Sequence, residues 1–121
     1  MVIHNSFSDF VVFLYVHMAL IDGGVHDAEL NEILRKMEDL YPPGMDKKVL
    51  LAQALEDYRK LDEQVISAII KTSFSRFEEA RTEKEKLYRD MFDIINADGV
   101  VNEAETKALA QLNEIIHLTK S

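Results

Sequence analysis

The sequence contains no cysteine and no tryptophan, and only two prolines and four glycines among 121 residues. Without cysteine, the chain has no disulfide, no zinc site with cysteine ligands and no thiol chemistry, which fits a reducing, cytoplasmic compartment. Strand-like alternation of polar and apolar residues is also missing. Helical periodicity is therefore the main structural signal, and it favours an all-α protein.

Positive charge is scarce as well, since 14 lysines and arginines face 22 aspartates and glutamates, for a net charge of −8. A nucleic acid needs a basic surface, and an anionic membrane needs one too, so neither is an expected partner. Cations and basic protein surfaces are favoured instead. A length of 121 residues with 47% hydrophobic residues suits a single folded domain that spans residues 1–121.

The longest apolar stretch runs from Phe10 to Ile21 and is too short for a membrane span. It covers 12 residues and includes His17, whereas a spanning helix needs about 20. No lysine or arginine precedes the stretch, and no small-residue cleavage site follows it, so a signal peptide is not expected either. We predict a buried helix and no membrane insertion.

Apolar residues at helical spacing predict a compact bundle of five to seven helices. Two helices are expected from Ser6 or Ser8 to Ile21 and from Asp27 to Leu40, where Pro42 and Pro43 end the pattern. The first helix and the one ending at Ala97 should be central. Later helices are expected to begin after Asp46, Asp62 and the capping box Thr82-x-x-Glu85, and a last one to run from Glu103 to about Leu118.

One short motif occurs twice in the chain. The residues D-G-G-V-H-D-A-E begin at Asp22, and D-G-V-V-N-E-A-E begin at Asp98, a constant offset of 76 residues. Each copy follows an apolar helix and precedes an amphipathic one. The repeat predicts two acidic helix–turn–helix corners related by an approximate twofold axis, within half-repeats around residues 8–40 and 83–118.

Turn chemistry explains much of this motif. Gly23 and Gly99 suit the left-handed conformation that ends a helix, and Asn102 is a good N-cap with Glu105 three residues on. Turn chemistry explains the aspartate before each glycine less well. An acidic residue at a helix C-terminus interacts unfavourably with the helix macrodipole, at a cost of roughly 0.3–1 kcal/mol. Its presence in both copies suggests a nearby positive group, either a cation or the N-terminus of another helix.

The two copies resemble the TerB-like family, which includes tellurite-resistance protein B and the N-terminal domain of a DnaJ-type co-chaperone. The similarity rests on A-x-x-D-G-x-V-x-x-x-E from Ala19 and A-D-G-x-V-x-x-x-E from Ala97, and extends from about Ser8 to Leu118. Ile21 and the additional Gly24 depart from the usual pattern in the first copy. The resemblance implies a helical, stress-response-associated domain with two half-repeats whose acidic residues hold a divalent cation.

Carried over by position, the resemblance implies a shared site for calcium or magnesium, since hard cations take carboxylate oxygens. Its candidate ligands are Asp22, Glu29, Asp98 and Glu105, with Asp27 and Glu103 as a possible outer layer. The alternative is a protein-interaction module in which the acidic corners only cap helices and an exposed helix face binds an unidentified protein partner.

Other metal and catalytic motifs fit poorly. The second copy overlays part of a calcium-binding EF-hand loop, but Ile94 stands where the leading aspartate ligand belongs. A single Glu114-x-x-His117 lacks the second such motif of di-iron bundles. No nucleophile with a partner and no glycine-rich phosphate loop is present, so the chain is not expected to be an enzyme.

His17 is the one histidine within the apolar stretch. At the 76-residue offset it corresponds to Asp93. A histidine on an apolar helix is usually hydrogen-bonded in the core. We predict that His17 and Asp93 approach each other, or at least face the same layer between helices.

Overall fold

A computed structural model describes residues 7–20, 27–77, 83–97, 103, 105–107 and 109–110. Five helices have defined bounds: α1 Phe7–Leu20, α2 Asp27–Leu40, α3 Lys47–Arg59, α4 Glu63–Arg76 and α6 Lys84–Ile95. Residues 103, 105–107 and 109–110 are helical too, and the described residues contain no strand. The prediction of an all-α bundle is confirmed.

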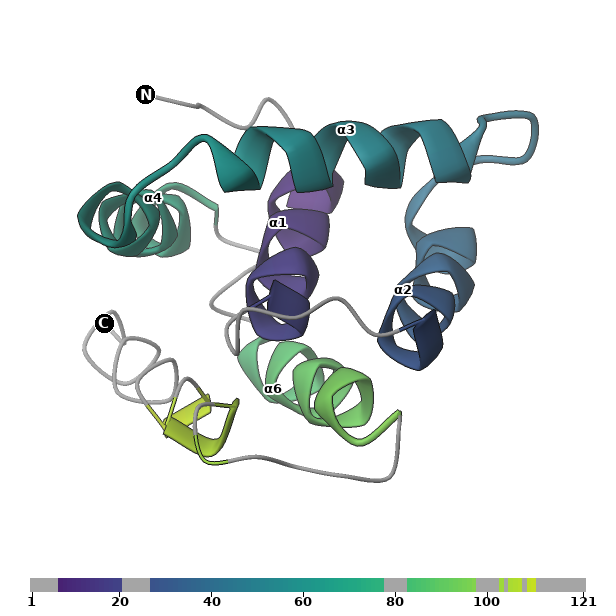
Figure 1. Cartoon of the computed structure of the whole chain (residues 1–121). Coiled ribbons are helices and arrows are strands. Elements are labelled where there is room, and N and C mark those ends of the chain that lie inside the picture. Colours follow the sequence, from purple (N-terminus) through teal and green to yellow (C-terminus); the bar gives the residue numbers. More distant parts are fainter. Residues whose placement is uncertain are drawn as a thin grey trace.

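Helix α1 lies at the centre of the molecule, with α2, α3, α4 and α6 around it (Figure 1). Its side chains from Phe10 to Val16 are all buried, as are Met18 and Ala19. A helix that is apolar on every side needs neighbours on every side, so the apolar stretch forms the core as predicted. Within the described ranges, no helix has both the length and the hydropathy needed to cross a membrane.

Helix α6 packs against α1 but is not central, which corrects the expectation for the helix ending near Ala97. Leu87, Met91 and Ile94 are buried along one face, while Arg89 and Phe92 on the other are exposed. This helix is amphipathic, so it needs neighbours only along its apolar face.

The N-terminal caps of α3 and α4 follow the sequence. The side chain of Asp46 accepts a hydrogen bond from the Val49 backbone N–H at 3.2 Å, and that of Asp62 accepts one from Val65 at 2.9 Å. The residue that caps α6 is Glu83, whose side chain makes no capping bond. Thr82, the expected cap of α6, lies outside the described residues.

The turn between α2 and α3 depends on a glycine. Gly44 has a φ of 96°, a conformation that disfavours residues with a Cβ. Tyr41, at the end of α2, donates its hydroxyl to Asp9 Oδ1 at 2.6 Å, and the Ser8 hydroxyl donates to the Leu40 carbonyl at 3.0 Å. These bonds attach the end of α2 to the beginning of α1.

Candidate functional site

The structure describes two of the four candidate cation ligands, and both are buried. Glu29 lies in the first turn of α2 and is 0% exposed, and Glu105 is 1% exposed. Asp22 and Asp98 lie outside the described residues. The proposed outer-layer residues Asp27 and Glu103 are exposed, which sets them apart from the buried glutamates.

The two copies of the motif share a burial pattern at the 76-residue offset. Glu29 and Glu105 are buried, as are Ile33 and Leu109 four residues further on in each copy. Asp27 and Glu103, two residues before the glutamates, are exposed, and so are Asn31 and Lys107, two residues after them. Two other pairs differ, because Leu30 and Leu34 are half-buried whereas their counterparts Thr106 and Ala110 are exposed. The similarity thus holds at four positions, and the structural repeat and its twofold axis stay predictions.

A buried carboxylate is costly unless something compensates its charge. Removing an ionised group from water costs several kcal/mol, by order of magnitude, unless hydrogen bonds, an opposite charge or a bound proton compensates it. Glutamates are among the side chains that are rarely fully buried, yet the motif buries one in each copy. Among the described residues, which do not include Asp22 or Asp98, no group of three histidines or carboxylates is placed to hold a metal ion.

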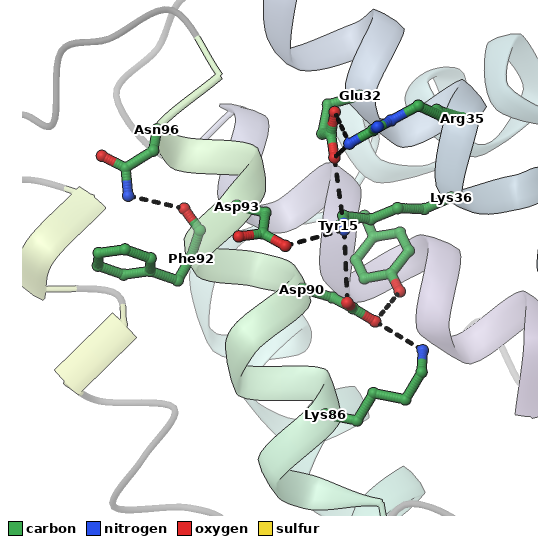
Figure 2. A network of polar contacts seen from close by, with 9 residues as sticks. All are labelled: Tyr15, Glu32, Arg35, Lys36, Lys86, Asp90, Phe92, Asp93 and Asn96. Carbon is green, nitrogen blue, oxygen red and sulfur yellow. Dashed lines mark hydrogen bonds and ion pairs between the residues drawn. The ribbon is translucent and has the colours of Figure 1, made fainter.

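A second polar cluster joins α1, α2 and α6, and the sequence did not predict it. We call it the Lys36–Asp90 network; it consists of Tyr15, Lys36, Lys86, Asp90 and Asp93 (Figure 2). The Tyr15 hydroxyl donates to Asp90 Oδ2 at 3.0 Å. Lys36 Nζ reaches Asp90 Oδ1 at 3.4 Å and Asp93 Oδ2 at 3.2 Å. Lys86 Nζ donates to Asp90 Oδ2 at 2.9 Å.

Two charges of this network, those of Asp90 and Lys36, are fixed at neutral pH. Burial raises the pKa of Asp90, but hydrogen bonds from Lys86 and Tyr15, together with the charges of Lys36 and Lys86, outweigh it and hold the pKa below its ordinary value. Burial lowers the pKa of Lys36, but the hydrogen bond to Asp93 and the charge of Asp90 leave it raised. Asp90 is thus ionised and Lys36 protonated. Burial and the Asp90 charge raise the pKa of Tyr15, which keeps its hydroxyl as a donor.

The Lys36 side chain is also held within its own helix. Its Nζ lies 3.4 Å from Glu32 Oε1, one turn earlier in α2. A hydrogen bond from Arg35 is the main cause that lowers the pKa of Glu32, so this carboxylate is ionised as well. Lys36 is thereby oriented from α2 towards α6.

His17 and Asp93 have different partners. His17 Nδ1 lies 2.8 Å from the Tyr58 hydroxyl of α3, whereas Asp93 faces Lys36 of α2. Burial lowers the pKa of His17 to about 4, so the ring is neutral at physiological pH. The contact of His17 is thus with α3, consistent with a hydrogen-bonded core histidine. Glu114 and His117 lie outside the described residues.

Sequence reasoning missed the Lys36–Asp90 network because its members have no common motif. The one available signal is Tyr15 itself, since a tyrosine within an otherwise apolar buried helix needs a partner for its hydroxyl. That partner lies 75 residues away in the chain, and helical periodicity does not identify it.

Comparison with known proteins supports the family assignment. A family described as "Tellurite resistance protein TerB" matches residues 8–121. Searches of curated proteins and of solved structures gave no match. Because the family match covers nearly the whole sequence, in agreement with the repeated motif and the helical fold, this chain belongs to the TerB family.

Proposed function

We propose that this TerB-family chain is a stress-response-associated module that binds calcium or magnesium through Glu29 and Glu105, together with Asp22 and Asp98. One observation carries the proposal: the two copies of the motif bury a glutamate at the same position. Turn chemistry alone requires neither side chain to leave water, because a capping glutamate works at a helix surface.

The residue types fit a hard cation. Calcium binds six to eight oxygen ligands and magnesium prefers six, many of them carboxylates. Two buried glutamates with two aspartates would supply four carboxylate groups, and backbone carbonyls or water would complete the set. A net charge of −8 further favours the approach of a cation over that of an anion.

Calorimetric titration of calcium, magnesium and zinc into the metal-free protein tests the proposal. We expect saturable binding of calcium or magnesium that is lost in Glu29→Gln/Glu105→Gln and in Asp22→Asn/Asp98→Asn. The matched control is Asp27→Asn/Glu103→Gln. It removes the same number of negative charges from the same two segments, but at exposed positions, so it should retain binding.

Two outcomes contradict the proposal. One is the absence of a binding signal together with an unchanged melting temperature at millimolar cation. The other is equal weakening by the buried and the exposed pair, which would indicate general charge screening without a site. Either would favour the protein-interaction alternative, for which the exposed apolar side chains Met45 and Val49 at the beginning of α3 are the first surface to examine.

A further inference from the structure

The Lys36–Asp90 network connects the two helices that adjoin the acidic corners. Helix α2 begins at Asp27, inside the first copy of the motif, and α6 ends at Ile95, three residues before Asp98. Lys36 lies seven residues after Glu29, a rise of about 10 Å along a helix. The contacts of Lys36 with Asp90 and Asp93 are among the polar contacts by which α2 reaches α6 (Figure 2).

The network is partly shielded from water and anchored on a third helix. The side chains of Lys36 and Asp90 are 14% and 13% exposed, so their attraction is screened less than that of a surface pair. Asp90 also accepts the hydroxyl of Tyr15, which is 1% exposed in the central helix. Asp90 therefore fixes α6 to α1, and Lys36 fixes α2 to the same carboxylate.

We propose that the Lys36–Asp90 network holds Glu29 of α2 in position relative to α6 and thereby sets the cation affinity of the proposed site. Lys36 is a positioning residue in this proposal and touches no cation. The proposal rests on the proposed cation-binding function. Groups that orient ligands without binding the metal are known to affect affinity strongly.

The sign of the effect separates positioning from simple electrostatics. If Lys36 acted only as a nearby positive charge, its removal would strengthen the binding of a cation. If it holds α2 in place for Glu29, its removal weakens binding. We therefore expect Lys36→Met to reduce the calcium or magnesium affinity by roughly twofold to thirtyfold, the range for mutations that act on coupling between sites, and Lys36→Arg to restore most of it.

Lys60→Met is the matched control. Lys60 also forms a 3.4 Å ion pair with a glutamate one turn earlier, Glu56, but its side chain is 67% exposed. The substitution removes the same charge, and we expect unchanged or slightly stronger cation binding. Tyr58→Phe, which removes a hydroxyl bonded between α1 and α3, controls for general loss of stability and should also leave affinity unchanged.

Calorimetric titration of the full chain with calcium and magnesium measures these affinities and the number of sites. Unchanged or stronger binding by Lys36→Met, with the same or a higher number of sites, would overturn the positioning role. So would equal weakening by Tyr58→Phe, because the effect would then follow stability alone.

A second measurement keeps this inference separate from the proposed function. If the unsubstituted chain binds no cation, the proposed function fails, and amide hydrogen exchange of the cation-free protein decides the positioning role. Faster exchange at Asn31–Leu34 in Lys36→Met than in Lys60→Met would support the network as the link between α2 and α6. Equal exchange in the two variants would refute it.

Discussion

Asp90 is not fully buried, yet the substitution Asp90→Ala should lower the free energy of unfolding more than most changes at such positions. Asp90 accepts hydrogen bonds from Tyr15, Lys36 and Lys86. Loss of the acceptor leaves a buried tyrosine hydroxyl without this partner, at a cost of about 1–3 kcal/mol. The exposed pair with Lys86 adds about 0.3–0.5 kcal/mol. Lys36 retains its ion pairs with Glu32 and Asp93, so the loss of its contact with Asp90 adds only a fraction of about 1 kcal/mol.

We therefore expect Asp90→Ala to lower the free energy of unfolding by about 2–4 kcal/mol in urea titrations. Asp93→Ala is the control, because Asp93 bonds only Lys36 among the contacts described and is 49% exposed; its cost should stay below about 1 kcal/mol. A double-mutant cycle measures the cost of Asp90→Ala again in the Tyr15→Phe variant, which has no hydroxyl to lose its partner. The cost of Asp90→Ala should then fall by about 1–2 kcal/mol.

Two results would refute this reasoning. One is a cost for Asp90→Ala below about 0.5 kcal/mol, the value of an ordinary surface substitution. The other is a cycle in which the two substitutions add to within about 0.3–0.5 kcal/mol, as independent sites do. The Tyr15–Asp90 bond would then contribute little to joining α1 and α6.

Three further predictions concern single residues. Burial lowers the pKa of His17 from 6.5 to about 4, so the unfolded chain takes up a proton before the folded one as pH falls, and the free energy of unfolding should decline from pH 6.5 towards pH 4. Urea titrations at pH 7 and pH 5 measure the decline, which should be smaller in His17→Gln. Gly44→Ala should cost about 1–2 kcal/mol from the backbone alone, because nothing lies within 4 Å of an added Cβ; thermal unfolding that matches the parent protein would contradict this. Asp62→Ala should cost about 0.5–2 kcal/mol through loss of the α4 cap, and Asp62→Asn should cost less; circular dichroism during thermal unfolding measures both.

Local features of this fold were predictable because neighbouring residues determine them. The bounds of α2 agree with the prediction, and so do the caps Asp46 and Asp62. A cap depends on hydrogen bonds within one turn, so the sequence contains the whole of it. The central place of α1 was equally predictable, since an apolar surface on every side of a helix permits no other location.

Contacts between helices were harder to predict. The sequence paired His17 with Asp93 by their offset, whereas His17 contacts Tyr58 and Asp93 contacts Lys36. Side-chain direction and helix rotation decide such contacts, and neither follows from position in a repeat. At the candidate site the resemblance named Glu29 and Glu105 as ligands and Asp27 and Glu103 as a possible outer layer. The structure buries the first two residues and exposes the other two.

The complete enclosure of α1 has a consequence for synthesis on the ribosome. Tyr15 and its partner Asp90 are separated by 75 residues, so α1 is made well before α6 exists. At 5–20 residues per second the interval is roughly 4–15 s, during which a strongly apolar helix has no complete cover. A nascent chain in this state is prone to aggregate or to attract chaperones, and the time to reach α6 sets how long that exposure lasts.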